Sequence, residues 1–477
     1  MRKYLWIVLL FLPCLYYIGT LLSWEKKKKL PITGDEPHYL IIAESILRDA
    51  DVDLKNNYED DAITKKILGP TDVENHTIPK NGKLYSVHPI GTSWLVLFGY
   101  AFSGIGGARI LLAILTGLLP FIFFNIGRMF HRSRSESAWL SLIYSIGLPF
   151  PMVAGQIFPD LPSGILFIFI FSSLLYLETH TKKKEFQNIL LFACGIGFGF
   201  LAWLHVKNMP AMIPLLLWFL SKKEWGFKSK IVSLGVTALF ILSLFYWNDL
   251  WYDSIRGSFF AAKNAPPRLD SRIEHWVTVG LGLFMDRNQG LFFQNPLIWI
   301  PGCIGWFYLF QSPKLRKFGI LLFLTLGIQW LLNAGHPCSY GCLALPGRFQ
   351  WGSATLWFIP FLGGWILLKN HSKTISQGIL ILAAVYQLWI GKYWFDHTAS
   401  LYHVMQPDPE KRPGFFPESI LPYLPSWTDL ENSWKNPING LWIGIFLFPL
   451  LAFGASQIRN KKESENGLKP LIDRESK

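Results

Sequence analysis

Long apolar segments alternate along the chain with short polar segments, most of them basic. Apolar runs of about 20 residues recur over its whole length, and a helix of that length crosses a hydrocarbon core of roughly 30 Å. The pattern therefore predicts an all-α polytopic membrane protein with about 12 transmembrane helices. The predicted spans are Tyr4–Leu22, Ala108–Ile126, Ala138–Gly155, Leu161–Leu177, Asn188–Leu204, Met209–Leu220, Ile231–Asn248, Leu291–Phe310, Phe318–Leu332, Ser353–Leu368, Ile375–Gly391 and Leu441–Ser456.

The basic segments between these helices predict the topology. Six of them are short: GRMFHRSRS, THTKKKEF, SKKEWGFKSK, SPKLRK, KNHSK and RNKKES. Lys and Arg are enriched in cytoplasmic loops, and all six clusters are cytoplasmic together if the apolar stretch His88–Gly104 does not cross. We therefore expect His88–Gly104 to form an interfacial helix in the first outer loop, and both termini to be cytoplasmic. The run EKKKK at residues 25–29 lies on the outer side and opposes this bias.

Composition supports the membrane class and limits what the charge means. Of the 477 residues, 51% are hydrophobic and 16% are charged, against about 25% charged in soluble domains. The net charge of +13 belongs to a protein with basic cytoplasmic loops, so it does not indicate nucleic-acid binding. The sequence contains no P-loop, HExxH or GxSxG motif.

The predicted outer loops collect nearly all the unusual polar residues. We divide the chain into a catalytic transmembrane module at residues 1–220, a variable transmembrane module at residues 221–456 and a cytoplasmic tail at residues 457–477. The catalytic module includes the first outer loop, residues 24–107. The variable module has outer loops at residues 249–290, 333–351 and 392–439.

Three carboxylates stand out beside the predicted spans. Asp35 and Glu36 are adjacent in GDEPHYL, and Asp160 lies between two prolines in FPDLP. Two adjacent carboxylates repel each other, which raises the pKa of one and suits it to accept a proton from a hydroxyl nucleophile. The alternative for Asp35 and for Asp160 is a helix N-cap, a role that can coexist with catalysis.

Cations in the outer loops are candidates for binding an anionic ligand. His205 and Lys207 occupy a tight turn in WLHVKNMP, Arg287 lies in MDRNQG, and Arg348 lies in LALPGRF. The positive-inside bias depletes this face of Lys and Arg, so we expect the retained Lys207 and Arg348 to bind phosphate. Contact with lipid headgroups is the alternative.

Together these motifs resemble the GT-C glycosyltransferases, especially the bacterial homologues of protein O-mannosyltransferases and of the lipid A aminoarabinose transferase. The resemblance rests on the acid pair beyond the first helix, the His-Pro that opens the interfacial helix, the PD motif and the lysine of WLHVKNMPAMIPLLL. It covers about the first 220 residues well and continues loosely through DRNQGLFFQNPL and GHPCSYGCLALPGRF. His88 stands where the family often has a lysine, and this departure leaves the sugar open.

The resemblance implies a plasma-membrane (inner-membrane) enzyme that transfers a sugar from a polyprenyl-phosphate-linked donor on the extracytoplasmic face. It implies that Asp35 is the general base and that Glu36 and Asp160 are the other acids of the catalytic site. A single displacement at the anomeric carbon would invert it. The residues expected to contact the donor phosphate are Lys207, Arg348, His205, His88 and Arg287.

The outer loops also bear on the acceptor, on the need for a cofactor and on the alternative functions. The outer loop 392–439 is too short for a large soluble domain, which favours a lipid or envelope glycan over a folded protein as acceptor. The sequence requires no cofactor, although the carboxylates could hold a divalent cation. A transporter or flippase would instead place ionisable residues near the bilayer midplane, and a polysaccharide polymerase or ligase would not need Asp35.

Overall fold

The computed structural model describes residues 4–27, 32, 34–60, 75–180, 183–258, 269–341, 344–397, 416 and 419–465. Parts of the predicted outer loops at 24–107, 249–290, 333–351 and 392–439, and much of the tail at 457–477, lie outside these ranges. The described chain is predominantly helical. Its strands, β1 (Thr77–Lys80) and β2 (Lys83–Ser86), form one antiparallel hairpin in which Thr77 is paired with Ser86.

The helices follow one another with short connections. In chain order the α-helices are α1 (Leu5–Lys26), α2 (Glu36–Arg48), α3 (Lys55–Glu59), α5 (Gly91–Thr116), α6 (Leu119–Met129), α7 (Arg134–Ile146), α8 (Phe150–Val153), α9 (Asp160–His180), α10 (Lys184–Leu204), α11 (Asn208–Ser221), α12 (Phe227–Tyr252), α14 (Ile273–Met285), α15 (Leu291–Gln294), α16 (Cys303–Gln311), α17 (Arg316–Ala334), α18 (Trp351–Leu356), α19 (Phe358–His371), α20 (Lys373–Asp396) and α22 (Pro437–Glu465). Short helical turns of other types are η2 (Ile298–Gly302), η3 (Ser339–Gly341), η4 (Arg348–Gln350), η6 (Leu421–Tyr423) and η7 (Ser433–Lys435).

Within the described chain, eight helices are long and apolar enough to cross a membrane, or nine if the bent pair 348–356 and 358–371 is one span. All twelve predicted segments are largely helical, which confirms the all-α polytopic class. Five of them are not long unbroken helices. Residues 108–126 are divided between α5 and α6, residues 138–155 between α7 and α8, and residues 353–368 between α18 and α19; residues 291–310 comprise α15, η2 and α16, and α11 has 14 residues. The pattern missed α14, which lies within the predicted outer loop 249–290.

The expected interfacial helix is the first part of α5. The backbone leaves helical geometry at Ser103 and Gly104, and Gly104 adopts a φ of 56°, in the left-handed region that favours glycine. Beyond this break the chain turns back, because Gly99 and Gly107 lie in backbone contact although eight positions separate them. A continuous helix would hold such residues about 12 Å apart. The apolar stretch before Gly104 is therefore a separate helix, as predicted.

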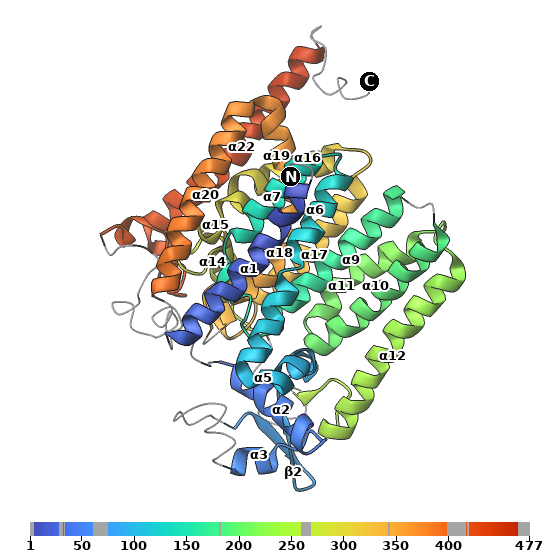
Figure 1. Ribbon diagram of the computed structural model, residues 1–477. Helices are drawn as coiled ribbons and strands as arrows, with labels where there is room; N and C mark the ends of the chain where they lie inside the picture. Colours follow the sequence, from blue (N-terminus) through green and yellow to red (C-terminus); the bar gives the residue numbers. More distant parts are fainter. Residues whose placement is uncertain are drawn as a thin grey trace.

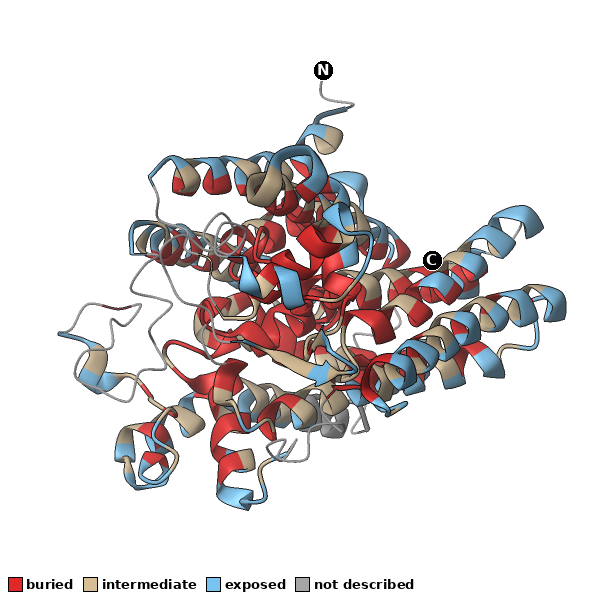
Figure 2. Cartoon of the chain, turned by 90° about the horizontal axis from the view of Figure 1, so that it is seen from below, coloured by how far each residue is buried: buried red, intermediate tan, exposed pale blue. Residues whose placement is uncertain are grey.

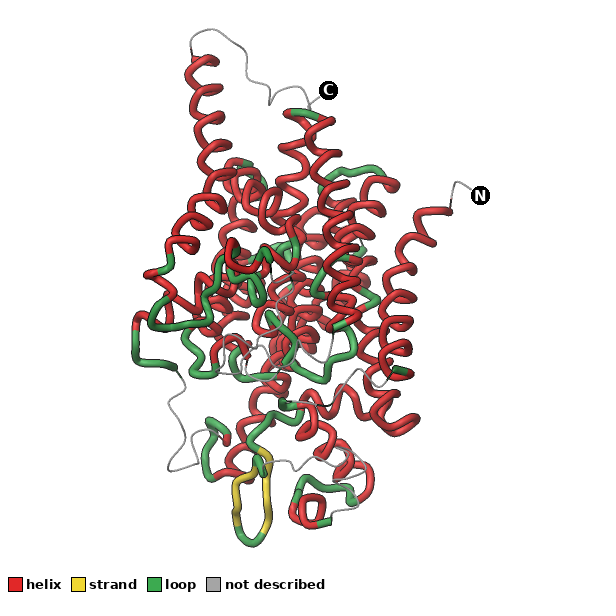
Figure 3. The backbone as a smooth tube through the Cα atoms, turned by 90° about the vertical axis from the view of Figure 1, so that its left-hand side faces the viewer, coloured by secondary structure: helices red, strands yellow, loops and turns green. Residues whose placement is uncertain are grey.

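The described ends of the chain lie toward one end of the helix bundle, whereas α2, α3 and the hairpin lie at the opposite end (Figures 1 and 3). A chain that crosses the membrane an even number of times has both ends on the same side, as seen here. The first loop thus covers one end of the bundle, and the functional residues discussed below come from this end.

Burial separates the helices into a packed centre and an outer ring, as Figure 2 shows. Large aromatic and aliphatic side chains of α1, α9, α18 and α19 belong to one continuous core. Several outer helices expose apolar side chains instead, including Leu239 on α12 (67% exposed) and Leu382 on α20 (72% exposed). Apolar faces of this extent suit contact with lipid.

Candidate functional site

One arginine joins two acids that come from distant parts of the chain. The Nη2 atom of Arg348 lies 2.6 Å from Oδ2 of Asp35, and its Nε atom lies 3.1 Å from Oδ2 of Asp160. The Nζ atom of Lys207 lies 2.6 Å from the other carboxylate oxygen of Asp160. The four residues that the sequence singled out most strongly therefore form one ion-pair network.

Asp35 enters this network from the start of α2. It follows Gly34, whose φ of 59° turns the chain, and it occupies the N-cap position of the helix. Its side chain accepts no capping hydrogen bond and is instead paired with Arg348. The N-cap alternative thus describes the position of Asp35 in the backbone but not the use of its carboxylate.

Glu36 points into the bundle and holds the two acid-bearing segments together. Its side chain is fully buried, and its Oε1 accepts a hydrogen bond from the backbone N–H of Ile157 at 2.9 Å. Its other oxygen lies 3.6 Å from Nη2 of Arg109 on α5. Because Ile157 is three residues before Asp160, Glu36 fixes the spacing between Asp35 and Asp160. The geometry is that of a positioning residue.

Lys207 projects from the tight turn between α10 and α11. The backbone N–H of Lys207 donates to Nδ1 of His205 at 3.1 Å, which orders this turn. The ammonium group lies 4.7 Å from the centre of the Phe349 ring, within cation–π range, in addition to its bond with Asp160. The turn thus aims Lys207 at the same acid that Arg348 binds.

Arg348 is held on two sides. Its Nη1 atom donates to the carbonyl of Gly341 at 3.1 Å, and its guanidinium carbon lies 4.1 Å from the centre of the Phe158 ring. The stacking face and the fork of donors are features of Arg that Lys does not share. The hydrogen bond to Gly341 and the contact with the Phe158 ring therefore hold the guanidinium in place.

The backbone before Arg348 is supported by glutamines of the DRNQGLFFQNP segment. Gly347 has a φ of 73°, and its N–H donates to Oε1 of Gln289 at 2.7 Å. Nε2 of Gln294 donates to the carbonyl of Pro346 at 3.2 Å. A Cβ atom at Gly347 would collide with Gln294. This part of the site needs glycine.

The charges of the network determine the protonation of Asp35. Burial by itself raises the pKa of Asp35, but Arg348, with His88 and His38 nearby, outweighs it and holds the pKa below its usual range. The expectation of a raised pKa is therefore wrong for Asp35, whose carboxylate is ionised at neutral pH. The reason is the guanidinium, which lies 313 positions away in the sequence.

The two histidines beside Lys207 and Arg348 are neutral. Burial, followed by the charge of Lys207, lowers the pKa of His205 to about 3. The same two causes, with Arg348 as the third, lower the pKa of His336 to about 4. At neutral pH the cationic groups of the site are therefore Lys207 and Arg348, while His205 acts on the backbone of its turn.

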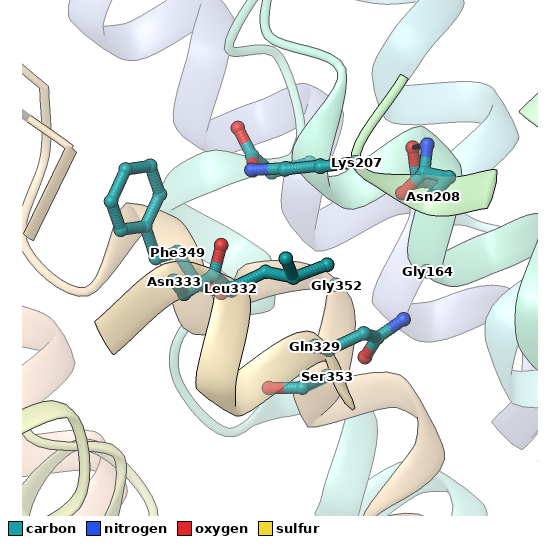
Figure 4. A pocket seen from close by; sticks show the side chains of 11 residues that line it. Gly164, Lys207, Asn208, Gln329, Leu332, Asn333, Phe349, Gly352 and Ser353 are labelled. Atoms are coloured by element: carbon teal, nitrogen blue, oxygen red, sulfur yellow. Dashed lines mark hydrogen bonds and ion pairs between the residues drawn. The ribbon is translucent and has the colours of Figure 1, made fainter. Parts of the chain in front are cut away.

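A small cavity opens beside the Asp160–Lys207 pair (Figure 4). Its walls come from α9, α11, α17 and the segment from Phe349 to Ser353, and both polar and apolar side chains line it. The helices approach closely here, because Gly164 of α9 and Gly352 of α18 are in backbone contact. The lining residues are Asp160, Ser163, Gly164, Lys207, Asn208, Gln329, Leu332, Asn333, Phe349, Gly352 and Ser353.

The other two predicted phosphate ligands lie in different surroundings. His88 forms a cluster with His38 and His76, next to Asp35. The guanidinium of Arg287 donates to the carbonyl of Leu421 at 2.7 Å, so it ties together two segments of the variable module. The structure thus brings four of the predicted residues into one network and uses Glu36 and His205 to order it.

Comparison with solved structures relates this arrangement to a class of proteins. ArnT from Cupriavidus metallidurans in the apo state matches 85% of this chain and 68% of its own, with a TM-score of 0.55 and 14% identity. ArnT from the same organism bound to undecaprenyl phosphate matches 86% and 67%, with a TM-score of 0.51 and 14% identity. The oligosaccharyltransferase of Archaeoglobus fulgidus in the apo form matches 86% and 59%, with a TM-score of 0.51 and 12% identity.

The chain therefore has the fold of the GT-C membrane glycosyltransferases, as its sequence predicted. No family model matches the sequence, and no curated protein matches it either. At 14% identity or less, the similarity defines the fold. The reaction has to be argued from the residues of the site.

Proposed function

We propose that this protein is an integral-membrane glycosyltransferase that moves a sugar from a polyprenyl-phosphate-linked donor to a lipid or envelope-glycan acceptor. The observation that carries the proposal is the network in which Arg348 joins Asp35 to Asp160 while Lys207 binds Asp160. It combines an ionised acid with two fixed cations on a fold shared with ArnT, one structure of which is bound to undecaprenyl phosphate.

The cations suit the leaving group. In the unliganded site each carboxylate is neutralised by a cation, and the side chains of Asp35 and Lys207 are the most exposed members, at 26% and 20%. A donor phosphate that binds Lys207 and Arg348 competes with the carboxylates for these cations. It would weaken the Arg348–Asp35 pair and so make Asp35 a stronger base when the donor is bound.

The reaction is a single displacement. The acceptor hydroxyl transfers its proton to Asp35 while its oxygen forms a bond with the anomeric carbon of the sugar. The bond between that carbon and the phosphate oxygen breaks, and its electron pair leaves on the polyprenyl phosphate, where Lys207 and Arg348 stabilise the charge. One displacement inverts the anomeric configuration.

The placement of the charges supports a transferase over a transporter. Asp160 begins α9, Lys207 lies between α10 and α11, and Arg348 begins η4, the turn before α18, so all three lie at the ends of helical segments. A transporter would need its ionisable residues near the bilayer midplane. We assign the site to the extracytoplasmic face of the plasma membrane because the basic clusters belong to the opposite loops.

The decisive experiment is transfer by the purified protein in lipid nanodiscs. Polyprenyl-phosphate-linked pentoses and hexoses are offered with lipid extracts and envelope glycans, and nucleotide sugars serve as the control donor. We expect transfer from the lipid-linked donor only, with inverted anomeric configuration by NMR. Mass spectrometry of lipids and glycans from a deletion strain identifies the acceptor. Transfer from the nucleotide sugar would refute the proposal. So would the absence of transfer from every lipid-linked sugar if the deletion strain also has normal glycans.

A further inference from the structure

Three histidines of the first loop converge beside the network. Nδ1 of His76 and Nε2 of His88 lie 3.1 Å apart, and one ring nitrogen from each of His38, His76 and His88 lies within 4.8 Å of the others. The rings are stacked, with centroids 4.1 Å apart for His38–His76 and 4.8 Å apart for His38–His88. In the described parts of the chain, this is the one group of three or more potential ligands close enough to hold a metal ion.

Local structure brings the three together. His38 lies in the first turn of α2 and is 2% exposed. His76 precedes β1 and His88 follows β2, so both lie at the open base of the hairpin, where the N–H of Val87 donates to the carbonyl of His76 at 2.9 Å. The hairpin thus presents two imidazoles to the one on the helix.

We propose that His38, His76 and His88 bind a divalent transition-metal ion of the zinc type. Zinc–imidazole bonds are about 2.0–2.1 Å long, so the nitrogens of a tetrahedral site lie about 3.3–3.4 Å apart. The nitrogens of the His76–His88 pair, at 3.1 Å, lie close to this spacing, and a nitrogen of His38 lies within 4.8 Å of them, so His38 would have to move toward the ion. Three protein nitrogens leave one coordination position for water or an oxygen ligand.

A hydrogen bond orients the His38 ring for metal binding. Nδ1 of His38 is hydrogen-bonded to the hydroxyl of Tyr58 at 2.8 Å, which leaves Nε2 for the metal. A partner on the second ring nitrogen is the usual outer-shell support of a metal-bound histidine.

The carboxylates that the sequence offered for a divalent cation have other partners. Asp35 and Asp160 are both bonded to Arg348, and Asp160 is also bonded to Lys207. Imidazole nitrogens therefore provide the better set of ligands, and they select zinc-like metals over magnesium or calcium.

The ion would connect the hairpin with the helix that carries Asp35. His38 is three residues after Asp35, and the N–H of Tyr39 donates to the carbonyl of Asp35 at 3.3 Å. A metal fixed on His38 would therefore hold the first turn of α2 in place. This role is to position Asp35, and the metal site itself stands whether or not the proposed transferase activity is found.

The test measures metal on the full-length chain, purified in detergent with a tag that contains no histidine and without chelators. We expect about one zinc ion per chain by inductively coupled plasma mass spectrometry. X-ray absorption should show nitrogen ligands at about 2.0–2.1 Å. Replacement by Co²⁺ should give the visible bands of a tetrahedral site. These measurements need no variant, so they remain decisive if a variant fails to fold.

Variants then assign the ligands. His76→Ala should weaken zinc affinity by more than about 100-fold, and Tyr58→Phe by about 10- to 100-fold. His131→Ala changes an exposed histidine after α6 and should leave affinity unchanged. A wild-type chain that binds no stoichiometric Zn²⁺ or Co²⁺ would overturn the proposal. So would equal zinc affinity in His76→Ala and His131→Ala.

Discussion

Asp35 and Arg348 form a 2.6 Å ion pair across 313 positions of sequence, and this pair joins the first loop to the segment before α18. It explains why Asp35 is ionised although the side chain is largely enclosed. It also gives the pair two functions that substitutions can separate, because Asp35 is the proposed base and Arg348 is the proposed phosphate ligand.

Replacing Asp35 by Asn tests the base. The substitution preserves shape and suits the N-cap position, but it removes the proton acceptor, and general acid–base catalysis contributes about 100- to 10,000-fold. We expect kcat to fall by that factor while donor binding persists. Single-turnover transfer in nanodiscs measures the effect, with a melting curve for each variant. Near-normal turnover in Asp35→Asn would move the base to Asp160.

Removing the cations tests the donor phosphate site. A hydrogen bond to a charged group contributes about 1.5–3 kcal/mol, so Lys207→Ala and Arg348→Ala should each lower kcat/KM for the donor by about 10- to 100-fold. Arg348→Lys should rescue little, because Lys cannot bridge two groups with a planar fork. Steady-state kinetics with varied donor concentration separate KM from kcat.

The matched control for these variants is Arg134→Ala, which removes an exposed arginine at the start of α7. It should leave both constants unchanged. If Lys207→Ala and Arg348→Ala behave like the control in folded protein, the phosphate assignment is wrong and contact with lipid headgroups becomes the better explanation.

The residues of the network could be selected from sequence because each is a charged group beside an apolar run. Their pairing could not, since Arg348 meets Asp35 only after the whole bundle has assembled. Arg109 was missed as the partner of Glu36, and Gln289 as a support of Gly347, for the same reason: these contacts link distant segments. Local sequence carries no signal for them.

Regular apolar spans were predicted well, and interrupted ones were not. The twelve segments all proved helical, but their pattern could not show the break at 295–297 between α15 and η2 or the bend between α18 and α19. The helix α14 was missed because its 13 residues are too few for a full crossing. The histidine cluster was missed because its members share no regular spacing in the sequence.

Gly347→Ala tests whether the turn before Arg348 determines the position of the guanidinium. Alanine is strained at a φ of 73°, and its Cβ would collide with Gln294. We expect a loss of stability above about 1 kcal/mol and a fall in donor kcat/KM similar to that of Arg348→Ala. Gly235→Ala on α12 is the control, because its Cβ would meet no atom within 4 Å. Equal effects of the two substitutions would contradict this role.

The pH dependence follows from the ionised state of Asp35. A carboxylate with a lowered pKa contributes stability above its unfolded pKa of about 3.9, and that contribution is lost as the pH falls through the lower folded value. Burial and the charge of Lys207 lower the pKa of His205 to about 3 and that of His336 to about 4, so both histidines stay neutral between pH 5 and 8. We expect kcat/KM to stay level between pH 5 and 8, within a factor of about two. A fall in kcat/KM toward acidic pH with a midpoint near pH 6 would contradict this prediction. It would show that the active base has a higher pKa than the ion pair with Arg348 gives Asp35.

The orientation of the site in the membrane is tested by cysteine labelling. Asn75 lies just before the hairpin, and Ser133 is the N-cap of α7, next to the basic cluster GRMFHRSRS. Both residues are exposed. We expect a membrane-impermeant maleimide to label Asn75→Cys in intact cells and to label Ser133→Cys only after the membrane is permeabilised.

The native cysteines make the background of this experiment low. Cys194 and Cys303 are buried, Cys14 is a partly buried free cysteine within α1, and Cys338 is disulfide-bonded. The unmodified chain serves as the control for both variants and measures the labelling of these native cysteines. The physical basis is the agreement of six basic clusters on one side, against the single run at residues 25–29. Labelling of Ser133→Cys but not of Asn75→Cys in intact cells would invert the topology. It would place Asp35, Arg348 and the histidine cluster in the cytoplasm, where an extracytoplasmic acceptor cannot reach them.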